Sequence, residues 1–113
     1  MDGRGARRKG HDFEREVARQ FAEVFGPNDV RRGLQYRDGA DCADVIAPAL
    51  WIECKRGRKT SARSALAQAT AASDGKGYWP VAICKDDNEP ATVTISLDDF
   101  LDLVREWWEL RRR

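Results

Sequence analysis

Histidine is nearly absent from this 113-residue sequence, with His11 as the single example. A zinc site made of several histidines is therefore excluded, and a Ser-His-Asp triad would have to use that one residue. The three cysteines show no Cys-x-x-Cys spacing, and Cys54 and Cys84 lie in apolar segments, where a reduced cysteine behaves as a small hydrophobe. No apolar run suits a signal peptide or a membrane span. These absences favour a cytoplasmic protein.

Charge is plentiful but unevenly distributed along the chain. The formal net charge is only +1, yet residues 31–63 hold eight basic residues against four acidic ones. Residues 85–110 show the opposite balance, with eight acidic residues against two basic ones. A basic surface suits a polyanion such as nucleic acid, so the middle of the chain is the expected binding region. The acidic end is interpreted as ordinary solvated charge.

Hydrophobic periodicity and turn residues predict an α/β fold. The expected elements are a helix over 12–25, strands over 30–36, 44–47 and 50–55, a helix over 61–73, strands over 78–84 and 92–97, and a final helix from about Ser96. The order α-β-β-β-α-β-β-α implies a mixed sheet of about five strands flanked by helices. Residues 1–9 are expected to be a mobile basic arm, and residues 10–113 a single domain.

The segment from Asp44 to Lys55 predicts a hairpin that gathers charged groups on one face. Pro48 and Ala49 form the reversal, which pairs residue 44 with residue 53. Because proline cannot take the positive φ of a tight turn, a wider loop with the same register is expected. Alternation then places Asp44, Glu53 and Lys55 together and leaves a wholly apolar opposite face. Two acids that close are unfavourable without a cation between them, so a divalent-metal site is predicted.

A third acid is expected to reach this site from the first helix. With about 100° of rotation per residue, Glu14 lies at the edge of the apolar stripe that begins at Phe13. Glu16 and Glu23 lie further from that stripe and are expected to be solvated. The pattern therefore favours Glu14 as an outer metal ligand.

The chemistry of these residues matches a hard cation. Mg²⁺ prefers oxygen ligands, so Asp44 and Glu53 are expected to bind it directly, with the backbone carbonyl of Cys54 beside them. Lys55 cannot be a ligand while it is protonated, but it can lower the pKa of a metal-bound water, orient that water or offset phosphate charge. This set suits hydrolysis of a phosphodiester by a metal-activated water, with one ion or two.

Two motifs carry a resemblance to a known family. Asp44, Glu53 and Lys55 resemble the PD-(D/E)XK nuclease pattern without its leading proline. Residues 9–16, which begin with Lys-Gly and end with Glu-Arg-Glu, resemble the opening of archaeal-type Holliday-junction resolvases and their phage relatives. In that family the first glutamate of Glu-Arg-Glu joins the active site. Carried over by position, this glutamate is Glu14.

The resemblance implies a restriction-endonuclease-like core and a metal-dependent, dimeric endonuclease that cuts branched DNA. The implied metal is Mg²⁺, with Mn²⁺ as its substitute, and the implied catalytic residues are Glu14, Asp44, Glu53 and Lys55. The implied setting is DNA recombination and repair in the cytoplasm of a bacterial, archaeal or phage-infected cell. The segment over 33–42 is longer than the compact turn of the archaeal enzymes.

Six cations near the hairpin are expected to contact DNA phosphates, which position the nucleic acid but do not read its bases. They are Arg31, Arg32, Arg56, Arg58, Lys59 and Arg63. For each of them, solvated charge is the alternative interpretation.

Three functions are open at this point. The first is an endonuclease that resolves four-way DNA junctions, and the second is a PD-(D/E)XK nuclease that acts on flaps, on nicks or in replication repair. The third, a nucleic-acid-binding module without catalysis, is disfavoured because clustered acids that face phosphate do not serve simple binding. Trp107 and Trp108 are interpreted as core or dimer contacts, whereas His11 and Gln68 are interpreted as exposed residues.

Overall fold

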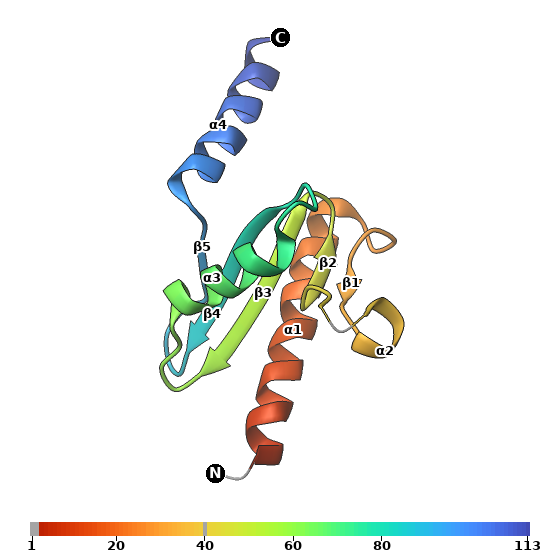
Figure 1. Cartoon of the computed structure of the whole chain (residues 1–113), viewed down its shortest axis with the longest axis vertical. Coiled ribbons are helices and arrows are strands. Elements are labelled where there is room, and N and C mark those ends of the chain that lie inside the picture. The colour runs from red at the N-terminus through yellow and green to blue at the C-terminus, as the bar shows by residue number, and fades with distance from the viewer. Residues whose placement is uncertain (1–2, 40) are drawn as a thin grey trace.

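A mixed five-stranded sheet with helices on both faces organises the molecule (Figure 1). The computed structural model describes residues 3–39 and 41–113. Its elements are α1 (Gly3–Phe25), β1 (Arg31–Arg32), α2 (Gln35–Asp38), β2 (Val45–Ala47), β3 (Leu50–Gly57), α3 (Ala62–Ser73), β4 (Trp79–Asp86), β5 (Thr92–Thr94) and α4 (Leu97–Arg112). The strands lie in the order β1-β2-β3-β4-β5, and only β3 and β4 are parallel. The predicted α/β class and mixed sheet are therefore confirmed.

The core consists of two layers, one on each face of the sheet. Helix α1 packs over β1, β2 and β3 with the buried side chains of Phe13 and Val17, which contact the fully buried Val45 and Ile52. Helix α3 packs on the other face over β3 and β4. Its buried residues are small, with Ala69 completely inaccessible, so its backbone can approach the sheet closely. The alanine-rich helix predicted over 61–73 is thus confirmed.

The first helix is longer than the sequence predicted. It ends at Phe25 as expected, where Gly26 adopts a φ of 99° and Pro27 follows. It begins at Gly3 rather than near Asp12, so residues 3–9 are helical where an irregular arm was expected. Arginine, lysine and alanine favour helix strongly enough to offset the glycines of this stretch. Residues 1–2 of the expected arm lie outside the described residues, and the division into one domain stays a prediction.

The strand predicted over 30–36 is wrong except at Arg31 and Arg32. After β1 the chain turns into the short helix α2, because the Asp38 carboxylate accepts a hydrogen bond from the Leu34 N–H at 2.9 Å. Gly33 makes the close approach to the next segment possible. A Cβ at this position would lie 1.8 Å from the carbonyl oxygen of Ala43. The Gly33 N–H instead donates to the Asp44 carbonyl at 2.9 Å, which attaches the turn to the hairpin.

The hairpin has the predicted register but a tighter turn. Val45 pairs with Ile52, and this places residue 44 opposite residue 53. The wider loop that was expected is wrong, because only Pro48 and Ala49 connect the strands. The positive φ of 66° falls on Ala49, so proline occupies the first central position, as in a type II turn. The Ala49 carbonyl also accepts a hydrogen bond from the Trp79 N–H at 2.9 Å, which ties the turn to β4.

The C-terminal helix projects away from the sheet, as Figure 1 shows. Ser96 caps α4 with its side chain, which accepts a hydrogen bond from the Asp99 N–H at 3.2 Å. None of the residues of α4 is buried. The described molecule measures 53 × 29 × 27 Å, and α4 accounts for one end of its long axis. Neither this helix nor any other in the described part of the chain combines the length and the apolar composition of a membrane span.

Candidate active site

Asp44 and Glu53 face each other where β2 and β3 begin to separate. The Asp44 N–H donates to the Ile52 carbonyl at 3.0 Å, just beyond the last pair of the hairpin, Val45 with Ile52. The Asp44 carboxylate also accepts a hydrogen bond from the Cys54 N–H at 2.9 Å. These two contacts hold the carboxylate against β3, beside Glu53.

Glu53 is a buried acid, with 4% of its surface exposed. Burial raises the pKa of Glu53 to about 8, and the neighbouring Asp44 adds to this rise through its charge and through a hydrogen bond that needs a proton. The Lys55 charge acts in the opposite direction but is the weaker influence. Asp44 and Glu53 therefore form a pair that resists carrying two negative charges, as the predicted register required.

Glu14 reaches the same region from α1. Burial raises the pKa of Glu14, and the charge of Asp44 is the second cause, so the two carboxylates lie close enough to repel each other. The Glu14 carboxylate accepts hydrogen bonds from the Arg32 guanidinium at 3.1 and 3.2 Å. The position predicted from the helical stripe thus agrees with the structure, but an arginine from β1 already neutralises this acid.

The Cys54 thiol shows how closely the three acids converge. This side chain is 8% exposed and packs in the core beneath α1. Burial raises the pKa of Cys54, and the charges of Asp44, Glu14 and Glu53 raise it further, in that order. The charges of all three acids therefore act on one position of β3, and a thiol at that position stays protonated.

The donor set fits a cation held by two carboxylates more closely than one held by three. Among residues 3–39 and 41–113, no three His, Cys, Asp or Glu side chains are grouped closely enough to hold a metal ion. Asp44 and Glu53 remain together despite their repulsion, and the backbone carbonyl of Cys54 follows Glu53 on the same strand. Carboxylate and carbonyl oxygens are the ligands of Mg²⁺, which usually completes its shell with water and substrate.

The six cations expected to contact DNA divide into two groups. The first group forms ion pairs with acids, with Arg31 bound to Asp38, Arg32 to Glu14 and Arg56 to Asp87. Lys9 of the opening motif joins the last of these pairs through Asp87 at 3.1 Å. The second group is exposed around the loop between β3 and α3 and consists of Arg58, Lys59 and Arg63.

A cleft of about 660 Å³ opens beside Glu53 and is lined on its other side by α3. Gln68 is an exposed residue of α3, as the sequence predicted, and it also lines this cleft, which the sequence did not predict. The available signal was its position three residues after Ala65 and one before Ala69, the small residues that face the sheet. Asp41, Cys42 and Lys76 complete the rim nearest to the hairpin.

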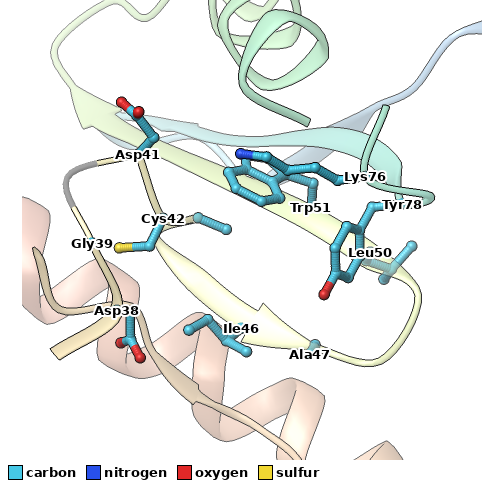
Figure 2. A pocket seen from close by; sticks show the side chains of 11 residues that line it. Asp38, Gly39, Asp41, Cys42, Ile46, Ala47, Leu50, Trp51, Lys76 and Tyr78 are labelled. Atoms are coloured by element: carbon cyan, nitrogen blue, oxygen red, sulfur yellow. The ribbon is translucent and has the colours of Figure 1, made fainter. Parts of the chain in front are cut away.

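Sequence reasoning missed a second hollow, which continues from that rim along the hairpin (Figure 2). Its volume is about 500 Å³, and Trp51 and Tyr78 form an aromatic wall with their ring centroids 5.7 Å apart. The Lys76 ammonium lies 4.8 Å from the Trp51 ring centroid. Tyr78 and Lys76 come from the segment after α3, so only the folded chain brings them to the hairpin.

Comparison with solved structures identifies an archaeal protein of similar fold. The structure of Hjc from Archaeoglobus fulgidus, a Holliday junction resolvase from an archaeal hyperthermophile, superposes with a TM-score of 0.54. The match covers 74% of this chain and 73% of that one, at 15% sequence identity. No family model and no curated protein matches the sequence. This chain therefore has a fold similar to that of the archaeal resolvase.

Proposed function

We propose that this protein is a metal-dependent endonuclease of the PD-(D/E)XK type that hydrolyses DNA phosphodiester bonds. The observation that carries the proposal is the pair formed by the half-buried Asp44 and the buried Glu53, with Lys55 two residues beyond Glu53 on the same strand. Two neighbouring carboxylates, one of them on the same strand as a lysine, suit a divalent cation and a phosphate. The similarity to an archaeal resolvase supports this reading at the level of the fold.

Each residue of the proposed site has a distinct role. Asp44 and Glu53 would hold Mg²⁺ or Mn²⁺ together with the Cys54 carbonyl, and Glu14 would act from outside the first coordination sphere, oriented by Arg32. The bound cation supplies Lewis-acid polarisation of a water and of the phosphate. Lys55 is half-buried two residues after Glu53, and its ammonium would orient the water and offset phosphate charge.

The proposed substrate is branched DNA, with a four-way junction as the first candidate. The archaeal protein of similar fold is a Holliday junction resolvase, and this is the basis for the choice. Arg58, Lys59 and Arg63 are the exposed cations available for phosphates without breaking an ion pair described above. A homodimer is proposed because two opposed strands of a junction need two active sites.

A cleavage assay with Mg²⁺ tests the proposal on three substrates: a four-way junction, a flap and a plain duplex. Paired symmetric cuts in the junction alone are expected, and Asp44→Asn should abolish them. Asp29→Asn is the matched control, because Asp29 is exposed and lies outside the cleft. Cleavage of all three substrates would reject the junction preference and leave a nuclease of other selectivity. Binding without cleavage by the unaltered protein would reject the enzyme and leave a binding module.

A further inference from the structure

Helix α4 presents a continuous apolar stripe to solvent. Large apolar residues recur along it at the i, i+3, i+4 and i+7 spacing of one helix face. They are Leu97, Phe100, Leu101, Val104, Trp107 and Trp108, with exposed fractions of 69, 50, 37, 38, 54 and 52%. A soluble protein seldom exposes so large a continuous patch unless another surface covers it.

The sheet and its helices do not cover this stripe. Within the described residues, α4 makes no extensive contact with any other helix or strand. The radius of gyration is 14.6 Å, whereas a compact domain of this length is expected at about 13 Å. The helix is nonetheless well formed, because Ser96 caps its start and acids and arginines match its dipole at the two ends.

The charges of α4 identify its partner. Asp98 and Asp99 lie in the first turn, whereas Arg111 and Arg112 lie in the last. When two copies of such a helix run antiparallel, the acidic start of each lies beside the basic end of the other. The charge pattern is therefore its own complement, and a second copy of this chain satisfies it without any other protein.

The area of the stripe is sufficient for such an interface. Phe100, Trp107 and Trp108 are each about half exposed, and an aromatic side chain can bury roughly 150–250 Å². With the three aliphatic residues, two stripes offer on the order of 1,000 Å², which is the lower limit for a specific interface. A dimer that dissociates on dilution is therefore expected.

We infer that α4 pairs antiparallel with α4 of a second copy and that this contact is the self-association surface of the protein. Sixteen residues at about 1.5 Å each make the paired helices about 24 Å long. Because each body is attached at the start of its own α4, the two bodies lie at opposite ends of the pair. This inference concerns assembly and does not depend on the proposed nuclease activity.

Sedimentation velocity over a dilution series of the full chain tests the surface. The unaltered protein should change from dimer to monomer on dilution, and W107A/W108A should be monomeric throughout with unchanged unfolding of the sheet body. A monomer at on the order of 100 µM for the unaltered protein would overturn the inference. A W107A/W108A variant that still dimerises would overturn it as well.

A charge exchange distinguishes the antiparallel arrangement from other contacts of the same stripe. D98R and R112D should each weaken the dimer roughly ten-fold, because each replaces two attractive pairs by two repulsive ones. An equimolar mixture of D98R and R112D should restore dimer formation, since all four charges then meet opposite ones. Simple loss of helix stability cannot produce that recovery, so a mixture that remains monomeric would reject the antiparallel pair.

The matched control is E106R. At about 100° per residue, Glu106 lies on the face of α4 opposite the stripe, so the same charge change should leave the dissociation constant unaltered. An E106R effect as large as that of D98R would show that net charge, not pairing, governs association. Such a result would also overturn the inference.

Discussion

The Asp44–Glu53 pair and the apolar stripe of α4 depart from the usual distribution of side chains in opposite directions. Glu53 places an ionisable group where the core excludes water, and Trp107 places an apolar group where water is abundant. Each arrangement is unfavourable in isolation. Each region therefore supports a proposal about what completes it, a cation for the first and the apolar surface of a second copy for the second.

The largest expected effect comes from a substitution that alters the Asp44–Glu53 pair and leaves the α4 stripe unchanged. Glu53→Gln keeps the size of the side chain but removes its charge, so Mg²⁺-dependent cleavage of a junction should fall at least about 1,000-fold. Glu23→Gln, an exposed change on α1, is the control and should retain full activity. Sedimentation of Glu53→Gln should remain that of the unaltered protein, because α4 makes no extensive contact with β3, the strand that carries Glu53. Near-normal cleavage by Glu53→Gln would contradict the assigned site.

Substitutions of two tryptophans, one buried beside the hairpin and one exposed on α4, are expected to change the free energy of unfolding by different amounts. Trp51 is 7% exposed and packs against Ala43 and Ala69, so Trp51→Ala should lower the free energy of unfolding by about 3–5 kcal/mol. Trp107 is 54% exposed, and Trp107→Ala should change the free energy of unfolding by less than about 0.5 kcal/mol under dilute, monomeric conditions. Urea unfolding followed by circular dichroism measures both. Equal losses would show that α4 packs on the body after all.

The pH dependence of stability tests whether the acids lack a cation. The raised pKa of Glu53 means that the folded state binds its proton more tightly than the unfolded state does. Without divalent ions, this contribution is full below pH 4.5 and should be lost as the pH rises to about 8. Glu53→Gln should remove that slope, and Mg²⁺ should stabilise the unaltered protein most at the upper end. A pH-independent difference between the two proteins would argue against the pair.

The smallest expected effect comes from removing the same capping contact in α3, which packs on the sheet, and in α4, which does not. Ser61 and Ser96 each accept a hydrogen bond at 3.2 Å from the N–H three residues later. Alanine at either position should destabilise its helix by about 1 kcal/mol. Ser61→Ala should lower the global free energy of unfolding, whereas Ser96→Ala should only reduce the helical signal of dilute protein. A global loss for Ser96→Ala would mean that α4 unfolds together with the sheet.

Local signals predicted much of the fold and the central part of the candidate site. The alternation from Val45 to Cys54 and the reversal at Pro48 were sufficient to place Asp44 opposite Glu53, since register follows from the turn and the apolar face. Helix ends followed from capping residues, with Ser61 and Ser96 as the clearest cases. These features depend on neighbours in sequence, so composition and spacing reveal them.

Contacts between distant segments could not be predicted in this way. The early end of β1 depends on Gly33, whose neighbour in space is Ala43. The pairing of Glu14 with Arg32 depends on where α1 crosses the first strand, and no spacing in the sequence gives that crossing. The aromatic hollow beside the hairpin likewise needs Tyr78 to return after α3.

By itself the sequence determined which residues share a face, because strand and helix periods are properties of the backbone. It therefore placed Asp44 on the same face as Glu53 and Glu14 at the edge of the apolar stripe of its helix. It also placed the six apolar residues of α4 in one stripe. Only the tertiary structure decided what each face meets. Burial raised the pKa of Glu53, Arg32 formed an ion pair with Glu14, and the α4 stripe was left facing solvent. The physical reason is that periodicity is local, whereas desolvation and ion pairing depend on packing between segments far apart in the chain.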